Sequence, residues 1–115
     1  MNNIINIKSH GNIAIITLDC ELDASVSEKI KEHIQQEIND DIQSFIINMS
    51  QVPFVDSHGV GLFASLLKNA YARNGVLSFS GVEGQPESLL KLVGFNDKLV
   101  NYYKNTEEAL QALSK

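Results

Sequence analysis

Three residues with chemically capable side chains stand next to one another in the middle of the chain, at Asp56, Ser57 and His58. A carboxylate, a hydroxyl and an imidazole are the groups of a hydrolytic serine triad. Two glycines, Gly59 and Gly61, are interleaved with the residues that follow, and turns at helix starts also bind phosphate groups. This stretch therefore raises three possibilities: a nucleophilic site, a phosphate site, or a plain strand-to-helix junction.

The serine hydrolase interpretation conflicts with the spacing of these residues. The imidazole of a triad lies between the serine and the carboxylate, and the members usually come from separate loops. Consecutive residues at the start of a helix point in different directions. The G-x-S-x-G nucleophile elbow is also missing, because Val55 stands two residues before Ser57. A small serine hydrolase remains an alternative, and a generic ester assay tests it.

A strand-to-helix junction explains the same residues without any chemistry. Asp56 and Ser57 both suit the N-cap of a helix, and the two glycines permit a tight turn and close packing of helix against strand. A serine at a helix N-terminus also lies where backbone N–H groups and the helix dipole stabilise an anion. The chain has no nucleotide-binding loop, so a phosphate on Ser57 would have to come from a separate kinase.

Length and composition restrict the class of protein. A chain of 115 residues suits one domain, over residues 1–115. The net charge of −5 argues against nucleic acid and against an anionic membrane surface as partners. The single cysteine, Cys20, favours a reducing, cytoplasmic location. The histidines show no zinc-ligand spacing, so we expect no metal and no cofactor, and we see no signal peptide or membrane span.

Hydrophobic patterns predict the elements that position the Asp56–His58 stretch. Strands are expected at residues 4–9, 12–18, 42–49, 76–80 and, as a short edge strand, 98–102. Helices are expected from about 23 to 38, from 59 to 74, from 86 to 93 and from 106 onward. The expected N-caps are Asp23 or Ser25 for the first helix and Thr106 for the last, and Gly75 is the expected stop of the second. This order predicts a small α/β domain with a mixed, mostly parallel sheet of 4–5 strands and helices packed on it.

Two motifs in the correct order carry a resemblance to a known family. FVDSHGVGLF, residues 54–63, resembles the F-x-D-S-[ST]-G-[LV]-G-x-[FL] signature of the STAS domain of bacterial anti-sigma factor antagonists. ITLDCELDA, residues 16–24, resembles the family's second motif, in which L-x-G-E-L-D closes the second strand and opens the first helix. Two positions depart from the pattern. Cys20 replaces a glycine, and His58 replaces a small residue; we interpret them as a small buried residue and an exposed first-turn residue.

The resemblance implies a phosphorylation switch at Ser57. In these antagonists the first serine of the D-S-[ST]-G motif is phosphorylated by a partner serine kinase that is also the anti-sigma factor. The unphosphorylated domain binds that kinase and frees sigma, the phosphorylated form cannot bind, and a PP2C-type phosphatase restores it. The resemblance thus implies a non-enzymatic, monomeric regulator of transcription. Its expected partner-binding residues are Asp56, His58, Gly59, Asp23 and Glu21.

Divergent STAS domains offer a second role. The same face could dock constitutively, as in a scaffold subunit of a lipid ABC transporter or of a stressosome-type complex. A neighbouring gene for a small kinase and a sigma factor would favour the antagonist, whereas neighbouring permease and ATPase genes would favour the scaffold.

Overall fold

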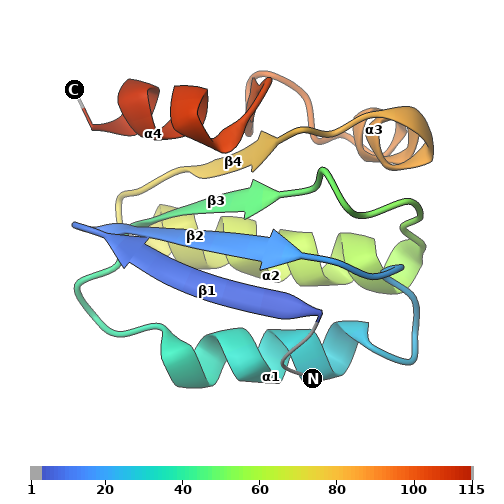
Figure 1. The fold of residues 1–115 in the computed structure, drawn as a ribbon, viewed down its shortest axis with the longest axis horizontal. Coiled ribbons are helices and arrows are strands. Elements are labelled where there is room, and N and C mark those ends of the chain that lie inside the picture. The colour runs from blue at the N-terminus through green and yellow to red at the C-terminus, as the bar shows by residue number, and fades with distance from the viewer. Residues whose placement is uncertain (1–3, 115) are drawn as a thin grey trace.

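The computed structural model describes residues 4–114, which form a five-stranded sheet with helices on both faces (Figure 1). The strands are β1 (Ile5–His10), β2 (Ile13–Leu18), β3 (Ser44–Asn48), β4 (Leu77–Ser80) and β5 (Asn101–Tyr103). The helices are α1 (Ser27–Glu37), α2 (Ser57–Ala72), α3 (Gly84–Leu92) and α4 (Thr106–Leu113). None of the helices in this part of the chain is long and apolar enough to span a bilayer.

The strands lie in the sheet in the order in which they occur along the chain, β1-β2-β3-β4-β5. β1 and β2 form an antiparallel hairpin, whose turn contains Gly11 at a φ of 62°. All later neighbours are parallel, because a helix returns the chain between them. The predicted mixed, mostly parallel sheet is confirmed, with five strands.

The core has one large and one small layer. Side chains on one face of the sheet pack against α1, α2 and α3, and on the other face Ile13 and Ile46 pack against Ala109 of α4. In β3 the successive residues Phe45, Ile46 and Ile47 are all buried, because alternate side chains enter opposite layers. A continuous apolar run of this kind is typical of a strand that is buried on both faces. Figure 1 shows α1 and α2 side by side along the sheet, with α4 beside β4.

The first helix begins later than predicted. α1 starts at Ser27, and its N-cap is Val26, not Asp23 or Ser25. Asp23 instead closes a separate turn, since its carboxylate accepts a hydrogen bond from the Ser25 N–H at 2.9 Å. Short polar side chains of this kind offer the backbone an alternative to helix, which explains the delay.

Other element ends also differ from the prediction. α2 starts at Ser57, two residues early, and the left-handed residue after it is Asn74 (φ 62°), not Gly75. Asn105, not Thr106, caps α4 and accepts the Glu108 N–H at 2.9 Å. The edge strand β5 also begins three residues later than expected, at Asn101.

Candidate functional site

The Asp56–His58 stretch is held in place by a contact between the segments that follow β2 and β3. Leu22 and Val55 form a parallel bridge, in which the Leu22 N–H donates to the Phe54 carbonyl at 2.9 Å and the Asp56 N–H donates to the Leu22 carbonyl at 3.0 Å. Leu22 and Val55 are fully buried. The next residues along the two segments are Asp23 and Asp56, so the bridge brings these two acidic residues to neighbouring positions.

Ser57 is the first residue of α2 and is exposed. Asp56 is the N-cap, as predicted, and its Oδ1 accepts the His58 N–H at 2.7 Å. An N-cap carboxylate stabilises the helix start and leaves the next side chain free to face the solvent. The Ser57 hydroxyl therefore lies at the positive end of a 16-residue helix, where an attached anion is favoured.

Gly59 permits the close contact between α2 and the Leu22–Val55 bridge. A Cβ at this position would lie 2.7 Å from Val55 Cγ1 and 2.9 Å from Leu22 Cβ, which is closer than atoms can approach without displacement. The prediction that Gly59 allows close packing of helix against strand is therefore confirmed. The same expectation for Gly61 is wrong, because nothing lies within 4 Å of a Cβ built there.

Gln85 is a positioning residue that the sequence analysis did not identify. Its side-chain amide makes two hydrogen bonds to the backbone of Val55: the Val55 N–H donates to Oε1 at 2.9 Å, and Nε2 donates to the Val55 carbonyl at 2.8 Å. Gln85 lies in the first turn of α3, thirty residues from Val55 in sequence. It thus acts as a substitute for a neighbouring strand at the residue that precedes Asp56.

Removing the Gln85 amide should loosen the start of α2. We expect Gln85→Ala to lower the free energy of unfolding by about 1–2 kcal/mol, because it leaves both polar groups of the buried Val55 backbone without their partners. Hydrogen exchange at the Val55 amide, measured by NMR, should become faster. Gln51→Ala is the matched control, since Gln51 is exposed and lines the same surface hollow as Gln85. Equal exchange rates in the two variants would contradict the positioning role.

The three consecutive residues do not assemble as a hydrolytic triad. His58 Nδ1 lies 3.4 Å from Asp56 Oδ1, and the His58 side chain is 58% exposed. Within residues 4–114, no hydrogen bond joins His58 to Ser57. A triad needs that second contact to activate the serine. His58 is thus an exposed residue of the first helical turn, as interpreted from the sequence.

The acidic residues before α1 occupy different positions relative to Ser57. Asp23 is placed next to Asp56 by the bridge, and hydrogen bonds from the Ser25 hydroxyl and then its backbone N–H lower the pKa of the Asp23 carboxyl. Glu21 is exposed on the other side of Leu22, and in the described part of the chain no hydrogen bond or ion pair links it to Ser57. The bridge therefore places Asp23 and Asp56 directly after its two residues, and Glu21 directly before it.

Cys20 is partly buried beside the core, in agreement with its interpretation as a small packing residue. Burial, followed by the nearby charges of Asp19 and Asp23, raises the pKa of the thiol. A thiol with a raised pKa stays protonated near neutral pH and is a poor nucleophile. Elsewhere, no cluster of three or more histidine, cysteine, aspartate or glutamate side chains suited to a metal occurs among residues 4–114.

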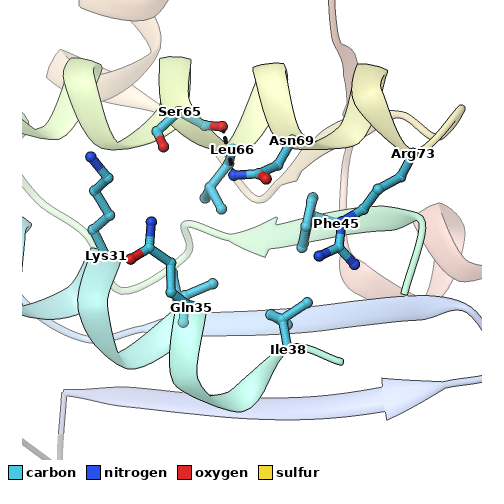
Figure 2. Close-up of a pocket in the computed structure, with 9 residues that line it drawn as sticks. Lys31, Gln35, Ile38, Phe45, Ser65, Leu66, Asn69 and Arg73 are labelled. Carbon is cyan, nitrogen blue, oxygen red and sulfur yellow. Dashed lines mark hydrogen bonds between the residues drawn. The ribbon is translucent and has the colours of Figure 1, made fainter. Parts of the chain in front are cut away.

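A small pocket between α1 and α2 is lined by polar side chains around Phe45 and Leu66 (Figure 2). Arg73 closes one end, and its guanidinium donates to the carbonyl oxygens of Asn39 and Ile42 at 2.8 and 2.6 Å. The arginine is therefore engaged in holding the loop before β3. We interpret this pocket as a packing seam between the two helices.

Comparisons with known proteins place the fold and the family. The chain is similar to a Thermotoga maritima protein proposed to be an anti-sigma factor antagonist (20% identity, TM-score 0.88, 96% of this chain and 95% of that chain). It is also similar to the anti-sigma factor antagonist SpoIIAA from Bacillus in its unphosphorylated form (22%, 0.74, 96% and 97%) and its phosphorylated form (22%, 0.76, 94% and 97%). A fourth similar structure is the murine Solute Carrier 26 family member A9 anion transporter (18%, 0.77, 93% of this chain and 18% of that chain).

The family model for the STAS domain matches residues 5–109, which is nearly the whole chain. The two motifs, the five-stranded mixed sheet with four helices, and the solved structures agree with that match. This chain belongs to the STAS domain family.

Proposed function

We propose that this protein is an anti-sigma factor antagonist, controlled by phosphorylation of Ser57 and without enzymatic activity of its own. The observation that carries the proposal is the exposed Ser57 at the capped N-terminus of α2, next to Asp56 and Asp23. The resemblance of the D-S-x-G motif to that of the antagonists, and similar structures that bear this name, support it.

In this proposal the partner is an anti-sigma factor that is also a serine kinase. The kinase transfers the γ-phosphoryl group of ATP to Ser57 Oγ, ADP leaves, and the hydroxyl proton is released. A PP2C-type phosphatase hydrolyses the phosphate and restores binding. The proposed setting is the cytoplasm, and the proposed active form is a monomer of one domain.

The proposed docking patch consists of residues around the start of α2. Its members are Ser57, Asp56, His58, Gly59, Asp23 and Glu21. A phosphate on Ser57 adds about −1.5 to −2 charge beside Asp56 and near the segment that carries Asp23. Because a helix N-terminus accepts an anion without refolding, the block on partner binding is electrostatic and steric.

The direct test is phosphorylation and binding of Ser57 variants with the cognate kinase. Mass spectrometry should find one phosphate, on Ser57, and Ser57→Ala should abolish it while keeping partner binding. Ser57→Asp should weaken binding by about 2–5 kcal/mol if the site is buried at the interface. Ser88→Asp, at an exposed serine of α3, adds the same charge away from the patch and should leave the affinity unchanged. A phosphate that persists in Ser57→Ala would refute the assignment.

A scaffold role in a transporter or stressosome-type complex is the second candidate. It is favoured by the likeness of this chain to part of a murine anion transporter. In that role the same face docks permanently, and Ser57 should carry no phosphate in the native host. Identification of proteins bound to the wild type and to Ser57→Asp in the native host separates the two candidates.

A further inference from the structure

A surface hollow lies directly beside Ser57, between the beginnings of α1 and α2. Its volume is about 300 Å³. The residues that line it are Ala24, Ser27, Glu28, Lys31, Ser57, His58, Gly61 and Leu62. Both helices start at this hollow, α1 at Ser27 and α2 at Ser57. Two positive helix ends therefore meet at one place on the surface, which favours an anion there.

The start of α1 is not closed by a side chain. Its N-cap residue is Val26, which makes no side-chain hydrogen bond to the first turn, whereas Asp56 caps α2. Glu28 lies in the first turn of α1 and is the one carboxylate among the lining residues. In this hollow the Glu28 carboxylate repels an anion, and the Lys31 ammonium group attracts one.

Ser27 adds an independent polar group among the residues that line the hollow. The residue is only 4% exposed, yet its hydroxyl oxygen has no hydrogen-bond partner among residues 4–114. Leaving a buried hydroxyl unpaired is unfavourable, and such groups in native proteins usually have a partner. The oxygen itself has almost no exposed area, so an oxygen-rich group in the hollow becomes its partner when the Ser27 side chain turns toward it.

Lys31 supplies the positive charge. It lines the hollow next to Ser57. Figure 2, a view of the neighbouring pocket that Lys31 also lines, shows its side chain extending from α1 toward α2. Within the described residues, no carboxylate lies within 4 Å of its ammonium group, although Glu28 shares the hollow. The ammonium group therefore remains available to an anion.

We propose that this hollow receives the phosphoryl group of phosphorylated Ser57, with the Lys31 ammonium and the Ser27 hydroxyl as its ligands. The inference rests on the proposed function, since it concerns the same serine. Phosphorylation then does more than add negative charge to the docking patch. It fills the hollow and fixes the Lys31 side chain across the two helix starts, so that the partner meets an altered surface as well as an altered charge.

The test uses protein with phosphoserine incorporated at position 57 during translation, which needs no kinase. The pH titration of its ³¹P NMR signal gives the second pKa of the phosphate, which is about 6 for an unperturbed group. A nearby ammonium group favours the dianion, whereas the carboxylates of Asp56 and Glu28 oppose it, so the effect of Lys31 is measured by removing its charge. Lys31→Gln should raise the phosphate pKa by about 0.5–1 pH unit, and Lys31→Arg should keep the wild-type value.

Lys29→Gln is the matched control, because Lys29 lies on the same helix, is exposed and does not line the hollow. It changes the net charge equally and should leave the phosphate pKa near the wild-type value. Equal titrations of Lys31→Gln and Lys29→Gln, in variants shown to be folded by their amide spectra, would overturn the proposal. Ser27→Ala tests the hydroxyl separately: loss of this donor should raise the phosphate pKa, and an unchanged pKa would remove Ser27 from the site.

The two proposals fail in different experiments. If the cognate kinase does not modify Ser57, the proposed function is wrong, whatever the titration shows. If the kinase modifies Ser57 but Lys31→Gln leaves the phosphate pKa unchanged, the proposed function stands and the phosphate-binding hollow is wrong.

Discussion

Gly75→Ala should destabilise the protein by about 3 kcal/mol or more, the largest effect of any single methyl group that we predict. A Cβ at Gly75 would overlap the carbonyl oxygen and the carbonyl carbon of Gln43. Both partners are backbone, so no side-chain rotation can relieve the contact. The segment is also fixed on both sides, because the Gly75 N–H donates to the Ala70 carbonyl at 2.7 Å and the Val76 N–H donates to Ser44 Oγ at 3.0 Å.

Gly61→Ala is the control for this prediction. Gly61 is exposed within α2, and nothing lies within 4 Å of a Cβ built there. Alanine has the higher helix propensity, so this variant should gain about 0.5–1 kcal/mol. Urea denaturation curves should therefore move in opposite directions for the two variants. A Gly75→Ala midpoint at or above that of the wild type would mean that β3 and the end of α2 are not packed as described.

Gly59→Ala should cost about 2 kcal/mol and should also weaken partner binding. Its Cβ would press against Val55 Cγ1, Leu22 Cβ and, at 3.1 Å, the Leu22 carbonyl oxygen. The Val55 side chain can rotate, which makes the cost smaller than at Gly75. The Leu22 backbone cannot move without breaking the bridge that places Asp23 beside Asp56, so the docking patch is disturbed together with the fold.

Two measurements on Gly59→Ala separate these effects. The denaturation midpoint reports the loss of stability, and titration with the partner at a temperature where the variant is fully folded reports the change at the patch. Gly61→Ala again serves as the control, because it changes the same helix near the same end. If both variants bind the partner with equal affinity, the Leu22–Val55 contact does not shape the docking surface.

The sequence predicted those parts of the structure that depend on local pattern. The apolar run in β3, the alternation of strands and helices, and the Asp56 N-cap are each set by residues close together in the chain, and all three are confirmed. The predicted start of α1 was wrong because an aspartate such as Asp23 can either cap a helix or close a local turn, and here it closes the turn. Only the packing of the finished fold selects between them.

The parts of the site that the sequence did not reveal depend on contacts between distant segments. Gln85 is thirty residues from the backbone group that it binds, and no local pattern marks a glutamine for that role. Gly75 was interpreted as a helix stop, but Asn74 takes the left-handed conformation and Gly75 instead avoids Gln43. The same glycine signal thus has two physical causes, chain reversal and close approach, which only the three-dimensional contacts distinguish. The acceptor role of Ser57 stays a prediction.

The order of the strands has a consequence for how the domain can form during synthesis. Because each strand pairs with the one made just before it, the sheet can grow one strand at a time as the ribosome releases the chain. No strand has to be inserted between two others. Each new strand reaches its neighbour across a connection that contains at most one helix. Folds with such short-range pairing reach the native state faster than those whose neighbours are far apart in sequence. Each newly formed sheet edge is then covered by the next strand soon after it appears, which limits the time during which the unfinished domain can aggregate.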